Sequence, residues 1–359
     1  MNETKTKFST KFPVLIILTS ILLLSASCVP FTETKVAGVI KTTNGGIDWQ
    51  TANKIKESEE NLSGVSVSVL GFDSGNEQRL LMASYSDGLF KSDNSAETWE
   101  RILSKISVYD FVISPENSDT IYAAGFFADH GKALVTRDGG KAWVEIYSEA
   151  STQNAVRAIA MNPQNSSEII IGMTSGNVIK SSDGGTTWKV LTNFEDRVNR
   201  ILYIGNNLYV LLRSKGLQKS VDGGQTFVSL SDALARVTGE ALYDSLLPLG
   251  SYSQLAVSRS NPNLIYVTAE SGLYKTTDEG KSWARVSVPV KNDEVAFKAV
   301  ALDPANDSVV YTAAGTTIYK STDGGQTFQI QAVSGSGFVN YLLVNPVQSQ
   351  IVYAGIFVE

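Results

Sequence analysis

The chain has 359 residues, of which 43% are hydrophobic, so it is long enough to bury a large core. Its formal net charge is −6 at pH 7, and no run of basic residues lies beyond the N-terminal segment. An acidic chain without a basic patch is poorly suited to the phosphate backbone, so we expect no nucleic-acid partner.

The N-terminal segment predicts export from the cytoplasm. Three lysines precede an apolar run over residues 12–24, and small residues follow up to Cys28. The run is short for a membrane span and is typical of a secretory signal. Because Cys28 is the only cysteine, no disulfide can form within the chain.

The stretch LSASC, residues 24–28, resembles a bacterial lipobox, in which the cysteine is lipidated and becomes the mature N-terminus. Ser25 departs from that pattern, because leucine is commoner there. We therefore expect a lipoprotein signal peptide over 1–27, a tether over 28–36 lipidated at Cys28, and a protein anchored in the bacterial cell envelope outside the cytoplasm. The alternative is an ordinary signal peptide with an incidental cysteine.

A short motif recurs along the remaining chain, 37–359. Its fourth copy, SSDGGTTW over 181–188, combines hydroxyls, an acid, two glycines and an aromatic residue. Asp183 can accept hydrogen bonds from the backbone two or more residues on, and glycines tolerate positive φ, so one copy alone predicts a turn. A catalytic or metal-binding loop is the alternative, but such a site is usually single.

Seven copies occur, and their terminal aromatic residues lie 39 to 56 residues apart. Two copies, ending at Trp49 and Trp99, have asparagine in place of the acid. The other five pair an acid with an aromatic residue: Asp138 with Trp143, Asp183 with Trp188, Asp222 with Phe227, Asp278 with Trp283, and Asp323 with Phe328. A fixed period indicates a repeat architecture, so we interpret these residues as structural.

Each repeat has the pattern of four short strands. Ahead of Trp188, the chain offers apolar segments at 156–161, 168–173 and 177–180, separated by Asn-Pro and Ser-Gly turns, and a fourth segment begins at Trp188. Four antiparallel strands are one blade of a β-propeller. The last residues supply two strands and the segment from Val36 supplies two more, so we predict an all-β, seven-bladed propeller closed by pairing of its ends.

The motif resembles the Asp box, or bacterial neuraminidase repeat. Families built from it include sialidases, xyloglucanases, sortilin-type receptor domains and the photosystem II stability/assembly factor family, which is similar in size, blade number and lipoprotein status. The resemblance implies the fold, with the boxes placed away from the ligand face. It does not transfer the arginine-bearing partner site of the assembly factors, because no residue-for-residue match is present.

Two sets of residues are candidates for a binding face. In a propeller, the connections from fourth to first strand and from second to third strand share one face, opposite the boxes. The stretch GFFADHGK, residues 125–132, is longer than its equivalents in other repeats and carries the first set: Phe126, Phe127, Asp129 and His130. We expect exposed aromatic residues there to contact a partner; the alternative is a loop that folds back over its own blade.

The second set lies near the starts of the predicted innermost strands, around the mouth of the central channel. It comprises Tyr109, Asp110, Arg157, Asn199, Arg200, Lys298, Asn340 and Tyr341. Three cations with few acids suit a carboxylate or an acidic peptide, although polar residues also simply solvate a wet channel. An insertion over 229–254, with a helical turn begun by Ser231 or Asp232, is a further expectation.

We expect a monomeric, non-catalytic scaffold that binds an envelope or membrane protein through one propeller face. The alternative is a glycoside hydrolase or carbohydrate-binding protein, because a pair of acids suffices for glycoside hydrolysis. Acids fall on or near the candidate loops at Asp87, Asp129, Glu195, Asp244 and Glu270. The sialidase Arg-Ile-Pro motif is absent, and one histidine and one cysteine argue against a zinc site, so we expect no metal or cofactor.

Overall fold

The structure, a computed structural model, describes residue 1 and residues 37–104, 106–234, 251–290, 295–333 and 337–358. The predicted signal peptide and tether, including Cys28, lie outside this part of the chain apart from Met1, as does most of the predicted insertion over 229–254. From Ala37 onward the described residues belong to one compact unit. No helix in the described ranges combines the length and the apolar character needed to cross a membrane.

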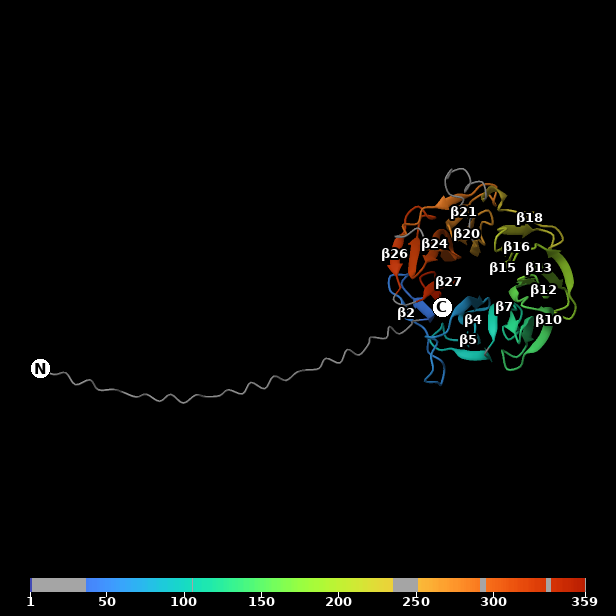
Figure 1. Ribbon diagram of the computed structural model, residues 1–359, viewed down its shortest axis with the longest axis horizontal. Coiled ribbons are helices and arrows are strands. Elements are labelled where there is room, and N and C mark those ends of the chain that lie inside the picture. The colour runs from blue at the N-terminus through green and yellow to red at the C-terminus, as the bar shows by residue number, and fades with distance from the viewer. Residues whose placement is uncertain (2–36, 105, 235–250, 291–294, 334–336, 359) are drawn as a thin grey trace. The chain divides into compact units, whose positions relative to one another are not determined.

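The predicted seven-bladed propeller is confirmed: seven four-stranded antiparallel sheets form a ring (Figure 1). The first strands, which lie innermost, are β3 (Val67–Asp73), β7 (Ser107–Ile113), β11 (Val156–Asn162), β15 (Val198–Ile204), β19 (Tyr252–Val257), β23 (Phe297–Asp303) and β27 (Phe338–Val344). The second strands are β4 (Asn76–Ser84), β8 (Ile121–Phe127), β12 (Asn165–Met173), β16 (Asn207–Leu212), β20 (Ile265–Ala269), β24 (Asn306–Ala314) and β28 (Val352–Phe357).

The outer half of each blade completes the ring. The third strands are β5 (Gly88–Ser92), β9 (His130–Thr136), β13 (Asn177–Ser181), β17 (Leu217–Ser220), β21 (Gly272–Thr276), β25 (Thr317–Ser321) and β1 (Gly38–Thr42). The fourth are β6 (Glu100–Ser104), β10 (Val144–Thr152), β14 (Lys189–Asn193), β18 (Val228–Ser229), β22 (Ala284–Val286), β26 (Gln329–Ala332) and β2 (Gln50–Thr51). We number the blades from one, β3 to β6, to seven, which holds both chain ends.

Blade seven closes the ring as the sequence predicted. Its strand order is β2-β1-β28-β27, and β1 pairs with β28 in antiparallel register from Gly38 opposite Ile356 to Thr42 opposite Val352. The N-terminal strand β1 thus lies between β28 and β2. This pairing removes the unpaired sheet edge that an open ring would leave.

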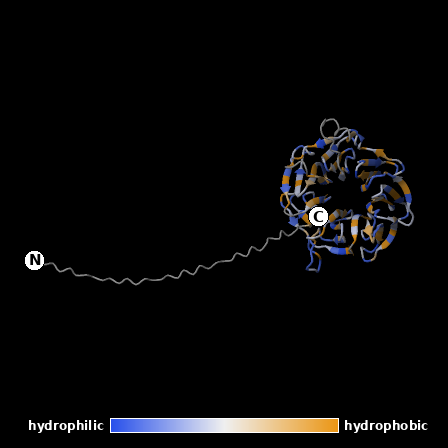
Figure 2. Cartoon of the chain, in the orientation of Figure 1, coloured by the Kyte–Doolittle hydropathy of each residue, from blue (hydrophilic) through white to orange (hydrophobic). Residues whose placement is uncertain are grey.

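The core is divided among the junctions between blades. Seven clusters of buried side chains each combine residues of two neighbouring blades. The second strands carry runs of buried residues, as in β20, whereas the fourth strands are mostly exposed or half-buried. Figure 2 shows hydrophobic and hydrophilic positions interleaved around the ring. Because both faces of a blade pack against neighbours, the ring forms a rigid frame for its loops.

The recurring motif forms the same turn in all seven blades, between the third and fourth strands. The first hydroxyl donates to the acid or amide two residues on and accepts the N–H four residues on. Ser181, for example, lies 2.8 Å from Asp183 and 2.7 Å from the nitrogen of Gly185. Gly185 has φ 96°, and a Cβ there would lie 2.7 Å from Ile146, so this position requires glycine.

In four of the seven copies, the terminal tryptophan ties the turn to the preceding blade by a hydrogen bond. The indole N–H of Trp143 donates to the carbonyl of Ile102 on β6 over 2.8 Å, and Trp188 does the same to Ile146 on β10 over 2.9 Å. Trp99 and Trp283 repeat the bond to Ala52 and Leu230. The turns are therefore built as joints between blades.

A second joint, which the sequence did not suggest, also links the turn to the preceding blade. In blade six, Tyr311 and Lys320 both donate to the carbonyl of Gly45, within the first motif copy. Blade five uses Tyr266 and Lys275 for Gly324 in the same way.

Candidate functional site

Every innermost strand carries a β-bulge near its start. The register against the second strand skips one residue in each blade, for instance between Val156 and Ala158 of β11. The skipped residues are Ser68, Tyr109, Arg157, Asn199, Ser253, Lys298 and Asn340. All seven line one cavity of about 600 Å³ at the channel mouth. A bulge re-aims the extra side chain, and here it builds a ring of seven side chains that point toward one space.

The connections of the predicted binding face complete this cavity, which we call the upper pocket. Tyr85, Arg213 and Glu270 come from the links between second and third strands, and Phe357 ends β28. Arg197 and Ser251 come from the links between fourth and first strands. The upper pocket thus opens on the face opposite the Asp boxes.

A buried ion pair forms the floor of the upper pocket. The guanidinium of Arg200 lies 2.8 Å from the carboxylate of Asp110 and donates to the hydroxyl of Tyr341 over 3.0 Å. Arg200 and Tyr341 also line a second cavity of about 490 Å³ below, whose walls are mostly apolar. We predicted Arg200 and Tyr341 as binding residues; both line the upper pocket, and their side chains are hydrogen-bonded to each other across the channel.

The carboxylate of Asp110 accepts three hydrogen bonds within the floor. Besides that from Arg200, it accepts the backbone N–H of Ile159 over 3.1 Å and that of Phe111 over 3.0 Å. Burial raises the pKa of Asp110, and the charge of Arg200 and these hydrogen bonds oppose that rise. The floor is therefore a fully bonded group of side chains rather than a free binding group.

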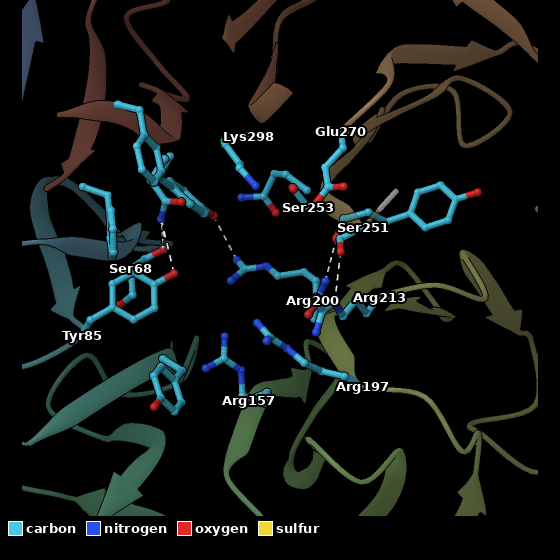
Figure 3. Close-up of a pocket in the computed structure, with 18 residues that line it drawn as sticks. Ser68, Tyr85, Arg157, Arg197, Arg200, Arg213, Ser251, Ser253, Glu270 and Lys298 are labelled. Carbon is cyan, nitrogen blue, oxygen red and sulfur yellow. Dashed lines mark hydrogen bonds between the residues drawn. The ribbon is translucent and has the colours of Figure 1, made fainter. Parts of the chain in front are cut away.

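The free cations of the pocket are Arg157, Arg197, Arg213 and Lys298 (Figure 3). Burial, with the charges of Arg157 and Arg213, lowers the pKa of Arg197 to about 10. The buried Nε atoms of Arg157 and Arg197 have no hydrogen-bond partner among the described residues. Among the described residues of the lining, Glu270 is the one carboxylate. The positive charges of this group repel one another and suit an anion, because guanidinium groups bind carboxylates with paired N–H donors.

Aromatic rings form the opposite part of the rim. Phe338 and Phe357 lie 4.9 Å apart between ring centres, Phe357 and Tyr85 5.2 Å, and Tyr85 and Tyr109 5.9 Å. The guanidinium carbon of Arg157 lies 3.9 Å from the centre of the Tyr109 ring, which joins the aromatic strip to the arginines.

The stretch 125–132 differs from its prediction. It is not an expanded loop: β9 is longer than the other third strands, and β8 and β9 pair up to Phe127 opposite His130, around a turn at Ala128 and Asp129 with positive φ. Phe127 is only 7% exposed and packs in the core between blades one and two, so its place on the binding face was wrong. The lengthened hairpin buries this ring because it carries the residue over the neighbouring blade.

The rest of that first set lies outside the upper pocket. Phe126 is half-buried, Asp129 is exposed and His130 is half-exposed, with its ring within 3.1 Å of the carbonyl of Ala128. None of them is among the residues that line the pocket. Of the second set, every residue except Asp110 lines it: Tyr109, Arg157, Asn199, Arg200, Lys298, Asn340 and Tyr341.

The predicted set did not include Arg197, Arg213, Tyr85 or Phe357. Arg197 immediately precedes an innermost strand and Arg213 follows a second strand, so the rule that placed the binding face was sufficient to find them. Of the acids considered for hydrolysis, only Glu270 lines the pocket, and Asp244 lies outside the described residues. Within the described ranges no group of three or more His, Cys, Asp or Glu side chains is placed to hold a metal ion.

Comparisons with known proteins agree with this fold. The sequence model of the sortilin-Vps10 family, described as sortilin, neurotensin receptor 3, matches residues 87–207. The xyloglucanase Xgh74A of Acetivibrio thermocellus is 24% identical over 269 residues, which are 70% of this chain. The chain spans only 29% of that relative's length.

Solved structures of two kinds are similar. The GH74 xyloglucanase from Xanthomonas campestris has a TM-score of 0.65 and 14% identity, covering 82% of this chain and 51% of the enzyme. YCF48 bound to D1 peptide has a TM-score of 0.59 and 15% identity, covering 82% of this chain and 94% of YCF48. YCF48 from Cyanidioschyzon merolae has a TM-score of 0.60 and 15% identity, covering 84% of this chain and 97% of that YCF48 chain. At these identities the likeness shows the fold, and the chain is an Asp-box, seven-bladed β-propeller similar in extent to YCF48.

Proposed function

We propose that the protein is a non-catalytic binding module that takes an anionic segment of a protein partner in its upper pocket. The observation that carries this proposal is the group of Arg157, Arg197 and Arg213 on one side of a cavity that has Glu270 as the one carboxylate among the described residues of its lining. The Nε atoms of Arg157 and Arg197 are buried without a hydrogen-bond partner among the described residues, and an acidic segment would supply acceptors for these side chains. The rigid blades present these side chains in fixed positions, which lowers the entropic cost of binding.

The comparison with YCF48 supports a protein ligand. One of its solved structures, by its own description, holds a D1 peptide, and YCF48 and this chain match over most of both lengths. Since that likeness shows the fold alone, the chemistry of the upper pocket is the reason to assign peptide binding here.

We further propose that the propeller is lipidated at Cys28 and is anchored in the bacterial envelope, outside the cytoplasm. The support is the signal-like segment and the lipobox-like LSASC. Metabolic labelling with an alkyne-bearing fatty acid tests it. Label should enter the wild-type protein and not Cys28→Ser; equal labelling of both, or of neither, contradicts lipidation at this residue.

The carbohydrate alternative has one point in its favour, the likeness to GH74 xyloglucanases. Glycoside hydrolysis ordinarily needs two carboxylates flanking the scissile bond, and the upper pocket offers Glu270 among five basic side chains. Release of sugar from xyloglucan by the purified protein, abolished by Glu270→Gln, would replace the binding proposal.

A capture experiment tests the main proposal. The full-length protein, solubilised in mild detergent, is crosslinked in a lysate of the source organism that retains its membranes. The double variant Arg197→Ala/Arg213→Ala should lose a protein that the wild type retains, because both changes remove donors from the pocket. Arg137→Ala is the matched control, since Arg137 is exposed and lies outside the pocket lining. Equal capture by all three proteins would contradict the proposal.

A further inference from the structure

The rim of the upper pocket is divided into an apolar and a cationic sector. Blades seven, one and two contribute four half-buried rings in an unbroken strip: Phe338, Phe357, Tyr85 and Tyr109. Each of these rings keeps part of its surface open to the pocket. Such a strip gains free energy when an apolar side chain covers it.

The cationic sector follows directly from blades three and four. Arg157 stacks on Tyr109 at the boundary, and Arg197 and Arg213 continue around the rim. In Figure 3, Tyr85 lies on one side of the pocket, and Arg197 and Arg213 lie across from it. The two sectors face the same space of about 600 Å³, which holds several side chains but not a folded domain.

The floor limits how a ligand can lie. Arg200, Asp110 and Tyr341 are hydrogen-bonded across the channel below the bulge ring, and we place the ligand in the upper pocket above them. A ligand that fills the upper pocket therefore meets both sectors at once. A small anion alone would satisfy the arginines and leave the aromatic strip in water.

We propose that the pocket recognises a bipartite peptide segment, in which an acidic side chain lies within a few residues of an aromatic or large aliphatic one. The carboxylate pairs with Arg157, Arg197 and Arg213, and the apolar side chain packs on the strip from Tyr85 to Phe338. This inference rests on the proposed function and names the ligand class of the same pocket.

A peptide panel tests the inference. Fluorescein-labelled nine-residue peptides on a Gly-Ser background carry one Glu and one Phe separated by zero to three residues, in both orders. Matched peptides replace Glu by Gln or Phe by Ala. Binding to the full-length protein in mild detergent is measured by fluorescence anisotropy. At least one Glu/Phe spacing should bind about tenfold more tightly than both of its matched peptides.

Two protein variants assign the sectors. Arg197→Ala should abolish the preference for Glu over Gln, whereas Phe357→Ala should abolish the preference for Phe over Ala and leave the charge preference intact. Phe126→Ala is the control for the aromatic change, because Phe126 is half-buried and lies outside the pocket lining. Thermal unfolding of each variant shows that the fold persists.

The outcomes separate this inference from the proposed function. If the Glu/Ala peptide binds as tightly as every Glu/Phe peptide, the aromatic strip has no role and the inference is overturned. If the Gln/Phe peptide binds equally, or no peptide binds, it is overturned as well. In each case the lysate capture still decides whether the arginines bind a protein partner.

Discussion

Arg200 and Asp110, on strands two blades apart, meet across the central channel with 2.8 Å between guanidinium and carboxylate. Arg200 lines both the upper pocket, which holds Arg157, Arg197 and Arg213, and the mostly apolar cavity below it. The pair therefore lies at the boundary between the two cavities.

Breaking this pair should destabilise the protein strongly. Asp110 is 2% exposed, so Asp110→Ala leaves a buried, unpaired guanidinium and should cost about 3–5 kcal/mol in the free energy of unfolding. The double variant Asp110→Leu/Arg200→Met removes both charges and should recover most of that loss. Denaturant unfolding measures both; a loss below about 1 kcal/mol for the single variant would mean that the pair is not a structural unit.

Removing a pocket arginine should have the opposite effect. Burial and the neighbouring arginines lower the pKa of Arg197, so its charge opposes folding at neutral pH. Arg197→Gln should therefore raise the unfolding free energy by about 1 kcal/mol at low salt, as expected when binding residues are held at a cost in stability. The gain should shrink in high salt, because salt screens the repulsion that is relieved.

Arg101→Gln is the control for that comparison, since Arg101 is exposed on β6 and lies outside the pocket lining. A loss of stability in Arg197→Gln of the size seen for a buried contact would show that Arg197 serves the fold and not a ligand.

Most of the fold was predictable because it repeats. The spacing of the aromatic residues fixed the number of blades, and strand pairing of the two ends followed from the incomplete first and last repeats. The Asp183 turn was readable from its own residues, since all its hydrogen bonds are local. The Tyr311 and Lys320 joint was not, because its acceptor lies more than 260 residues away in the chain.

The candidate site was predictable in part for the same reason. Alignment of the innermost strands found Arg157 and Lys298, since both occupy the repeated bulge position. Whether a cation is free depends on its partner, and only the structure shows that Arg200 is bound to Asp110 while Arg157 is not. The prediction that Phe127 lies exposed on the binding face was wrong, because a lengthened hairpin resembles a long loop in sequence.

Phe127 gives a direct test of that correction. Its ring is 7% exposed in the core between two blades, so Phe127→Ala should cost about 3–5 kcal/mol. Phe126→Ala, one residue earlier on the same strand, should cost clearly less, because that ring is half-buried. Urea unfolding measures the free energy of unfolding of both variants. Equal and small losses of stability would show that the Phe127 ring is exposed.

The Asp-box carboxylates should make stability depend on acid pH. Hydrogen bonds from the side chain and backbone of Thr187 and from Ser181 lower the pKa of Asp183 to about 2. An aspartate depressed below its unfolded value of about 3.9 contributes stability that is present above that value and is lost as the pH falls towards 2. Asp183→Asn should therefore lower the melting temperature at pH 7 and flatten its fall between pH 4 and 2.

The second motif copy supplies the converse experiment. Asn94 accepts the backbone N–H of Thr98 over 3.0 Å, and its amide nitrogen donates to the Thr98 hydroxyl. At the equivalent place in the fourth copy, the carboxylate of Asp183 accepts from the hydroxyl of Thr187. Asn94→Asp should hence steepen the loss of stability in acid. Unchanged acid profiles in both variants would show that these hydrogen bonds do not couple to folding.

The central claim is that the pocket face, and not the Asp-box face, meets the partner. A photoreactive benzoylphenylalanine is placed in the full-length protein either at Ser214, which is exposed beside Arg213, or at Thr186, which is exposed in the fourth Asp box. Irradiation in the membrane-containing lysate should give a protein adduct from Ser214 that disappears on Arg197→Ala, and none from Thr186. An adduct from Thr186 alone, or one from Ser214 that survives Arg197→Ala, would contradict the account.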